Sequence, residues 1–69
     1  MWRRLVDSSC LRSIGYDPVD GVLEVRFVHG DVYQYHEVPA DVHEAFMAAE
    51  SKGRYLNAHL RDAFPYCRL

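Results

Sequence analysis

A group of basic and polar residues near the C-terminal end is the strongest candidate for a binding site. It consists of Lys52, Arg54, Tyr55, Asn57 and Arg61. Arg54, Asn57 and Arg61 are spaced so that an α-helix would present them on one face. Guanidinium groups offer planar, forked donors that suit phosphate oxygens, so this face is a candidate for phosphate contacts. The alternative is an ordinary solvated helix face, on which Glu50 or Asp62 would pair with the arginines.

The central Tyr33-Gln34-Tyr35 is the second candidate. On a strand, the two tyrosines would share one face and could form a platform on which unpaired bases stack. The alternative is ordinary core or cross-strand packing, which is common for aromatic residues at this spacing. Both interpretations stay open at this stage.

The charges are unevenly distributed along the 69 residues, whose formal net charge is -2. Residues 1–12 sum to +2, residues 13–50 to -7 and residues 51–69 to +3. The overall balance argues against a generally basic nucleic-acid binder and against a polybasic membrane anchor. A local basic face would form if the fold brought the two ends together.

The chain carries no recognisable catalytic or metal-binding pattern. Ser8, Ser9 and Cys10 are adjacent, but no local signature links them to a general base, and the chain is short for enclosing a substrate pocket. The four histidines, at positions 29, 36, 43 and 59, form no His-x-x-x-His pair. We therefore expect no enzyme activity, metal or cofactor.

Cys10 and Cys67 are the two cysteines, and no Cys-x-x-Cys pair exists. Charged residues follow Met1-Trp2 at once, so we expect neither an export signal nor a membrane span. The expected location is the reducing cytoplasm, where both thiols would be free and would pack as small buried hydrophobic groups.

Three strands are predicted, at about 10–16, 22–28 and 31–38, and they form an antiparallel meander. Residues 17–21 have the composition of a turn, and Gly15 suggests a bulge or a close backbone approach. A two-residue His29-Gly30 loop would turn Tyr33 and Tyr35 away from the apolar face. A three-residue loop that adds Val28 would place them on it, and we favour this register because it buries two aromatic rings.

Two helices are predicted after the sheet, at about 40–52 and 54–63. The first carries an apolar stripe that includes Phe46, and Gly53 is well placed as its C′ residue. Lys52 would then lie near the negative end of its dipole. The stripe of the second helix is Leu56, Leu60, Ala63 and Phe64, and Pro65 ends it.

The predicted fold class is therefore α+β, a three-stranded antiparallel meander followed by two helices packed on one sheet face. A single face is expected because the chain holds too little apolar material to bury two. Phe27 and Phe46 should be central to the core. With so few residues, the net stability should be about 3–5 kcal/mol.

The chain resembles the KTSC domain family, a small domain found at the C-terminus of some lysyl-tRNA synthetases and as stand-alone bacterial proteins. The resemblance rests on an ordered set of short motifs: Ser8-Ser9, Ile14-Gly15-Tyr16-Asp17, Phe27 with Gly30, Tyr33-Gln34-Tyr35, Val38-Pro39, residues 51–57 and Leu60-Arg61. It implies that residues 1–69 form one KTSC-like domain. It brings no catalytic residue, and RNA binding is only a suggestion for the family.

Two functions fit these observations. One is an accessory RNA-binding module that uses the basic C-terminal segment, with Tyr55 as the first stacking residue and Tyr33 or Tyr35 as the second. The other is a protein interaction module that docks through an exposed sheet edge or the helix at Tyr55–Arg61, without enzymatic activity. The sequence does not indicate an oligomeric state.

Overall fold

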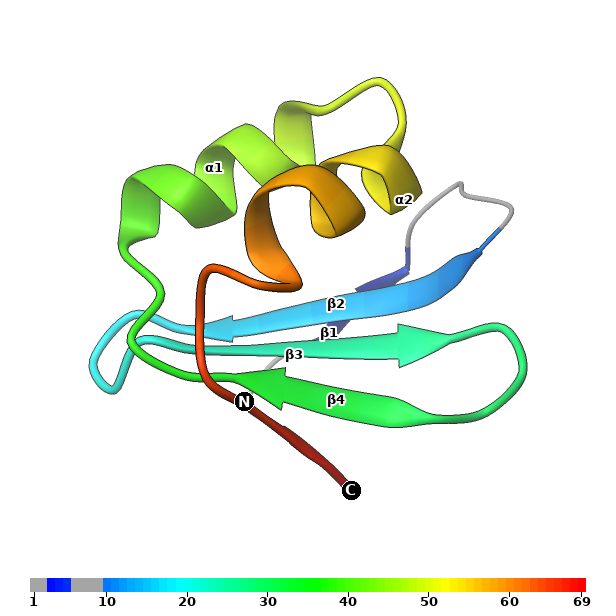
Figure 1. Cartoon of the computed structure of the whole chain (residues 1–69), viewed down its shortest axis with the longest axis horizontal. Coiled ribbons are helices and arrows are strands. Elements are labelled where there is room, and N and C mark those ends of the chain that lie inside the picture. The colour runs from blue at the N-terminus through cyan, green and yellow to red at the C-terminus, as the bar shows by residue number, and fades with distance from the viewer. Residues whose placement is uncertain (1–2, 6–9) are drawn as a thin grey trace.

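The computed structural model describes residues 3–5 and 10–69 (Figure 1), so Ser8 and Ser9 of the resemblance lie outside the described residues. All described strands belong to one antiparallel sheet, whose spatial order follows the sequence. The strands are β1 (Arg3–Leu5), β2 (Leu11–Asp17), β3 (Val22–Phe27), β4 (Val32–Tyr35) and β5 (Tyr66–Arg68). The predicted meander is confirmed as β2–β3–β4. The short strands β1 and β5, which were not predicted, extend the meander at its two edges.

The turn between β2 and β3 forms as its composition predicts. The Asp17 side chain accepts a hydrogen bond from the backbone N–H of Val19 at 3.0 Å, and Gly21 has a φ of +67°. The Gly21 carbonyl accepts a hydrogen bond from the Val38 N–H at 2.9 Å. Tyr16 donates its hydroxyl to the Val38 carbonyl at 2.6 Å, so this turn is tied to the segment that leads into the first helix.

The hairpin between β3 and β4 has the favoured three-residue loop, Val28-His29-Gly30. The Phe27 N–H donates to the Asp31 carbonyl at 2.9 Å, and Val25 pairs with Tyr33 in the register. Tyr33 and Tyr35 therefore share the apolar face of the sheet, as predicted. This register decides which face of the sheet carries the two tyrosine rings.

The bulge in β2 lies between Leu11 and Ser13, not at Gly15, where it was suggested. A bulge adds one residue to its strand, which inverts the alternation beyond it. Leu11 and Ile14 are three residues apart and would otherwise face opposite sides, yet they are only 1% and 2% exposed. The bulge allows both to enter the core.

The helical part of the chain departs from the predicted boundaries. It comprises α1 (Ala40–Ala48), α2 (Lys52–Tyr55) and the π-helical turn η1 (Leu56–Leu60). The first helix ends at Ala48 instead of 52, because Ser51 accepts a hydrogen bond from the Arg54 N–H and caps the next helix. Lys52 begins α2, yet its Nζ still donates to the Ala49 carbonyl at 3.2 Å, just beyond α1.

Gly53 is not the C′ residue of the first helix but lies within α2. It packs against Cys10, whose thiol is 3.5 Å from the position that a Cβ at residue 53 would take. The second helical segment starts two residues earlier than predicted, and its C-cap is Arg61, which keeps α-helical dihedral angles ahead of Pro65. Its predicted stripe is correct at Leu56 and Leu60, whereas Ala63 is exposed.

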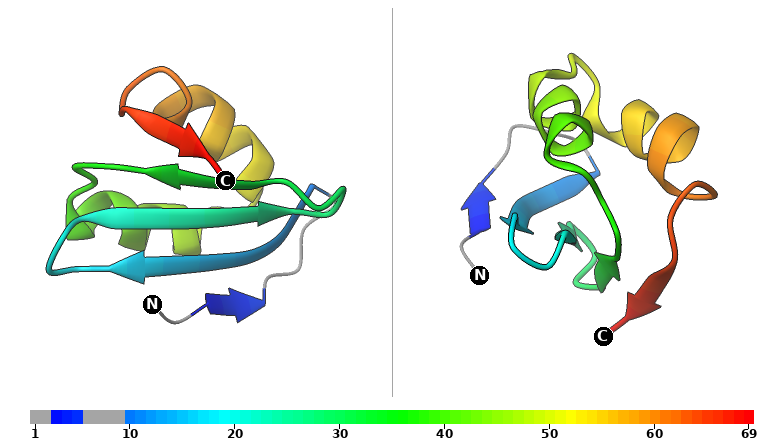
Figure 2. Two further views of the ribbon diagram at one scale, coloured as in Figure 1. Left: turned by 90° about the horizontal axis from the view of Figure 1, so that it is seen from below. Right: turned by 90° about the vertical axis from the view of Figure 1, so that its left-hand side faces the viewer.

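Both helical segments cover the same face of the sheet, as predicted (Figures 1 and 2). The core lies between these layers and includes Phe46, which has no exposed surface. Phe27 is only partly buried and packs at the margin of this core, which corrects its predicted central position. Its remaining surface borders a cleft between the sheet and the second helical segment.

Candidate functional site

The cleft between the sheet and the second helical segment has a volume of about 220 Å³; we call it the aromatic groove. Its sheet wall consists of Phe27, Tyr33, Tyr35 and Tyr66. Its helix wall consists of Leu56, Asn57 and Arg61, and His29 borders it from the β3–β4 loop. Segments from the middle and the end of the chain thus form one concave surface.

Strand pairing gathers the tyrosines of the sheet wall. Tyr35 pairs with Tyr66 across β4 and β5, so the two side chains lie next to each other on the helix-covered face. The rings of Tyr33 and Tyr66 stack at 5.5 Å with an interplanar angle of 19°. Tyr66 is 53% exposed and Tyr35 only 2%. Tyr66 therefore has an accessible ring, whereas Tyr35 is part of the floor.

The helix wall depends on the π turn. The Arg61 N–H donates to the carbonyl of Leu56, five residues earlier, at 2.8 Å. This turn takes about one residue more than an α-helical turn, which rotates the following side chains by about 100° relative to an α-helical row. Asn57 and Arg61 line the aromatic groove on this segment. Turns of this kind occur frequently at functional sites.

Arg61 provides positive charge at the groove. Burial raises the pKa of the Tyr35 hydroxyl above its ordinary value of 10.0, and the neighbouring Tyr66 and Tyr33 raise this pKa further. The positive charge of Arg61 lowers the same pKa, which shows that Arg61 acts on the groove. Tyr35 therefore stays a neutral hydroxyl at physiological pH. Within the described part of the chain, Arg61 has no ion-pair partner. Its guanidinium is available to an anionic ligand.

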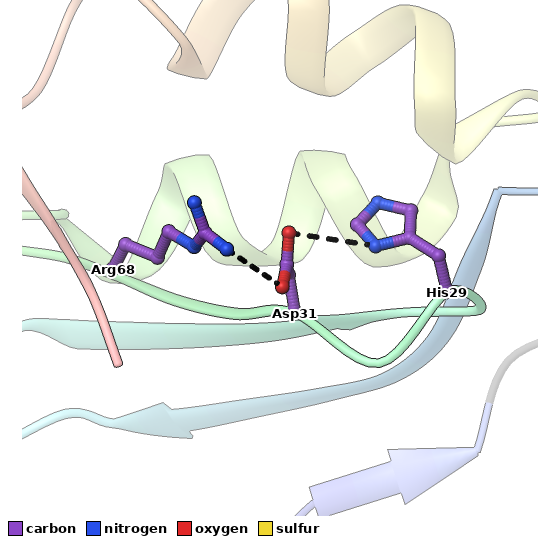
Figure 3. Close-up of polar contacts among 3 residues, drawn as sticks. All are labelled: His29, Asp31 and Arg68. Atoms are coloured by element: carbon purple, nitrogen blue, oxygen red, sulfur yellow. Dashed lines mark hydrogen bonds and ion pairs between the residues drawn. The ribbon is translucent and has the colours of Figure 1, made fainter.

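A small polar cluster forms the rim beside Tyr33 (Figure 3). Arg68 of β5 pairs with Asp31 at 3.2 Å, and the His29 Nδ1 lies 3.5 Å from the other carboxylate oxygen of Asp31. Arg68 is opposite Tyr33 in the strand register. The carboxylate thus holds a second guanidinium and an imidazole at the edge of the aromatic groove.

The candidate residues from the sequence divide between two places. Tyr33, Tyr35, Asn57 and Arg61 line the aromatic groove. Arg54 and Tyr55 instead line a broad, open hollow of about 550 Å³ at the end of α1. Arg54 therefore borders a different hollow from Asn57 and Arg61, and the π turn interrupts the α-helical spacing on which the predicted basic face was based.

The hollow beside α1 is a weaker site than the groove, although it is larger. The Tyr55 ring stacks on Phe46 at 5.6 Å and contacts the His59 ring at 4.6 Å. Tyr55 is partly buried, whereas Tyr66 of the groove is exposed. Lys52 is engaged with the end of α1. Neither Glu50 nor Asp62 forms an ion pair with Arg54 or Arg61 in the described region, so the predicted alternative pairing is not present.

Three residues of the groove were not among the sequence candidates: Phe27, His29 and Tyr66. The alternation of Tyr66 and Arg68 directly after the helix-ending Pro65 was the available signal for a short strand. Of the two basic end segments, the strands β1 and β5 lie at opposite edges of the sheet (Figure 2). The segments meet where Gly53 packs against Cys10.

The cysteines differ from the prediction in their burial. Cys10 and Cys67 are not joined in a disulfide, and both are exposed, whereas the prediction was that they would be buried. The described residues contain no group of three or more side chains that could hold a metal ion. Among the helices of the described region, none is long and apolar enough to span a membrane.

The fold and the groove define a class of protein: a small α+β domain whose sheet bears helices on one face and an aromatic groove beside them. Comparison with known proteins then gives the family. The sequence model of the KTSC domain matches residues 7–64, so the chain belongs to the KTSC domain family. The resemblance inferred from the motifs is confirmed.

Relatives of similar length are found in several bacteria. The chain is 42% identical over 59 residues to a protein of Tsukamurella paurometabola, covering 86% of this chain and 88% of that one. It is 47% identical over 57 residues to an uncharacterized protein of Stutzerimonas stutzeri, covering 83% and 80%. The crystal structure of a KTSC domain protein from Yersinia pestis superposes with a TM-score of 0.92 and 40% identity, covering 99% and 96%.

A longer relative has a named activity. The chain is 32% identical over 63 residues to a lysine–tRNA ligase of Nostoc, and this match covers 91% of the chain but 11% of the ligase. The similarity therefore concerns one small part of that enzyme.

Proposed function

We propose that this protein is an accessory module that binds unpaired RNA in the aromatic groove. The observation that carries the proposal is the exposed Tyr66 ring, which stacks on Tyr33 in the same groove as the Arg61 guanidinium. An aromatic face beside a guanidinium suits a base linked to a phosphate. The named activity of the longer relatives, ligation of lysine to tRNA, supports RNA as the partner.

The expected binding is weak and sensitive to salt. Stacking one base on Tyr66 would contribute about 1–3 kcal/mol. If Arg61 and Arg68 each contact one phosphate, the logarithm of the association constant should fall with the logarithm of salt concentration with a slope of about -1.4. Arg68 would share its guanidinium between the phosphate and Asp31. Binding should therefore be detectable at low salt and be lost near physiological salt.

The test is a chemical-shift titration of the labelled protein with a mixed-sequence single-stranded oligoribonucleotide at low salt. Arg61→Gln and Arg54→Gln form a matched pair, because both arginines are exposed and belong to the same helical segment but border different hollows. We expect shifts at Asn57 and Tyr66, and a salt slope smaller by about 0.7 only in Arg61→Gln. An absence of shifts at low salt would refute RNA binding, and equal weakening by both variants would refute the groove.

A second candidate, a protein interaction module, is favoured by the outer edge of β5. This strand is the last in the sheet order, and the exposed Tyr66 and Leu69 lie on or beside it. An extended peptide could add a strand there through main-chain hydrogen bonds. Binding of a partner protein that is insensitive to salt, together with no response to RNA, would favour this function.

A further inference from the structure

A second hollow of about 300 Å³ adjoins the aromatic groove. The two hollows share four lining residues, Phe27, His29, Leu56 and Asn57, and the second extends from them to Cys10 and Gly53. Each hollow alone is at or below the lower end of the size of small-molecule sites, about 300 Å³. Joined, they form an elongated path between the β3–β4 hairpin and the second helical segment.

Two accessible rings border this path, and each is supported by an inner ring. Tyr66 stacks on Tyr33 at 5.5 Å and 19°, and His29 stacks on Phe27 at 5.3 Å and 4°. The His29 side chain is 60% exposed. The inner rings meet edge to face at 5.4 Å, which holds the two pairs in a fixed relation. An inner ring limits how far its outer ring can tilt, so both outer rings are already oriented to stack on a base.

Polar groups lie between and beside the platforms. Asn57 lines both hollows, and its amide can both donate to and accept from the edge of a base. Arg61 borders the Tyr66 side, and Arg68 lies at the rim through its ion pair with Asp31. Aromatic faces with a neutral amide between them and guanidinium groups beside them suit stacked bases that are linked by phosphates.

We propose that this extended groove binds two bases of one unpaired RNA strand, one stacked on Tyr66 and the other on His29. This inference rests on the proposed function and adds the number of bases and the role of His29. Bases in a duplex are already stacked and paired, so they have no free face for either platform. The ligand is therefore a single-stranded segment longer than one nucleotide.

The experiment compares a mononucleotide, a trinucleotide, a hexanucleotide and a duplex of the hexanucleotide sequence at low salt. We expect the trinucleotide to bind about 5- to 150-fold more tightly than the mononucleotide, the fold-change that corresponds to one additional stacked base. The hexanucleotide should gain little further affinity, and the duplex should bind much more weakly than the single strand.

His29→Ala should reduce the affinity for the trinucleotide to about that for the mononucleotide, whereas His29→Phe, which keeps a flat ring, should retain it. His59→Ala is the matched control, because His59 is exposed and borders the hollow beside α1. Circular dichroism confirms that each variant folds. Two results would overturn the two-base site but not RNA binding. One is equal affinity for the mononucleotide and the trinucleotide. The other is that His29→Ala has no effect while Arg61→Gln still weakens binding. No binding by any oligonucleotide would overturn the proposed function itself.

Discussion

Replacing Gly53 with alanine tests the second helical segment, because sequence and structure predict opposite effects on stability. If Gly53 were the C′ residue of the first helix, it would have the left-handed conformation, in which alanine costs about 1–2 kcal/mol. In the structure Gly53 lies within α2, and the described glycines with positive φ are Gly21 and Gly30. Alanine should then be favoured at this position.

The magnitude follows from helix propensity and the surrounding space. Alanine is better than glycine inside a helix by about 0.5–1 kcal/mol. The added Cβ would lie 3.5 Å from the Cys10 thiol and 3.6 Å from the Cys10 Cβ, which are ordinary van der Waals contacts. The added methyl group therefore causes no steric clash that would offset the gain in helix propensity. For a domain of this size the melting temperature should therefore rise by about 2–8 °C.

The assay is thermal and urea unfolding of the wild type, Gly53→Ala and Gly21→Ala, followed by circular dichroism. Gly21→Ala is the control of opposite sign, because Gly21 has a φ of +67° and a Cβ there would lie 3.3 Å from the Val38 carbonyl oxygen. Its melting temperature should fall. A fall in the melting temperature of Gly53→Ala as well would refute the placement of Gly53 within a helix.

Three further predictions concern the core and the thiols. Phe46→Ala should be largely unfolded at 37 °C, because Phe46 has no exposed surface and its truncation costs about 3–5 kcal/mol in a domain of similar total stability; a cooperative native-like melt would contradict this. The pKa of Tyr35 is raised in the folded protein, so the folded protein keeps a proton that the unfolded chain releases near pH 10.0. The free energy of unfolding should therefore be unaffected by Tyr35 below that pH and fall above it. Tyr35→Phe should reduce this alkaline loss in melts recorded across that range, and an unchanged profile would contradict it. Reductant should leave the melting temperature unchanged, since Cys10 and Cys67 are not joined in a disulfide. A lower melting temperature in reductant would contradict this.

The strand positions and the packing of helices on one face of the sheet were predictable, because both depend on the pattern of apolar and polar residues within each segment. The alternation in residues 22–28 marks one buried face, and the apolar stripe around Phe46 marks one buried helix side. The hairpin register was also predictable, because only one loop length buries Tyr33 and Tyr35. The edge strands are only three residues long, so the alternation of Tyr66 and Arg68 is a weak signal that does not indicate which strand β5 pairs with.

The composition of the site is partly visible in the sequence, but its assembly is not. The amino-acid types at Tyr33, Tyr35, Asn57 and Arg61 by themselves suggest stacking and phosphate contacts. Their meeting depends on the π turn, which changes the direction of Arg61 and has no sequence signature. It also depends on the pairing of β5 with β4, which brings Tyr66 beside Tyr35. Cross-strand pairing and helix rotation are set by packing between segments distant in the chain, so only the tertiary structure determines which of these residues form one groove.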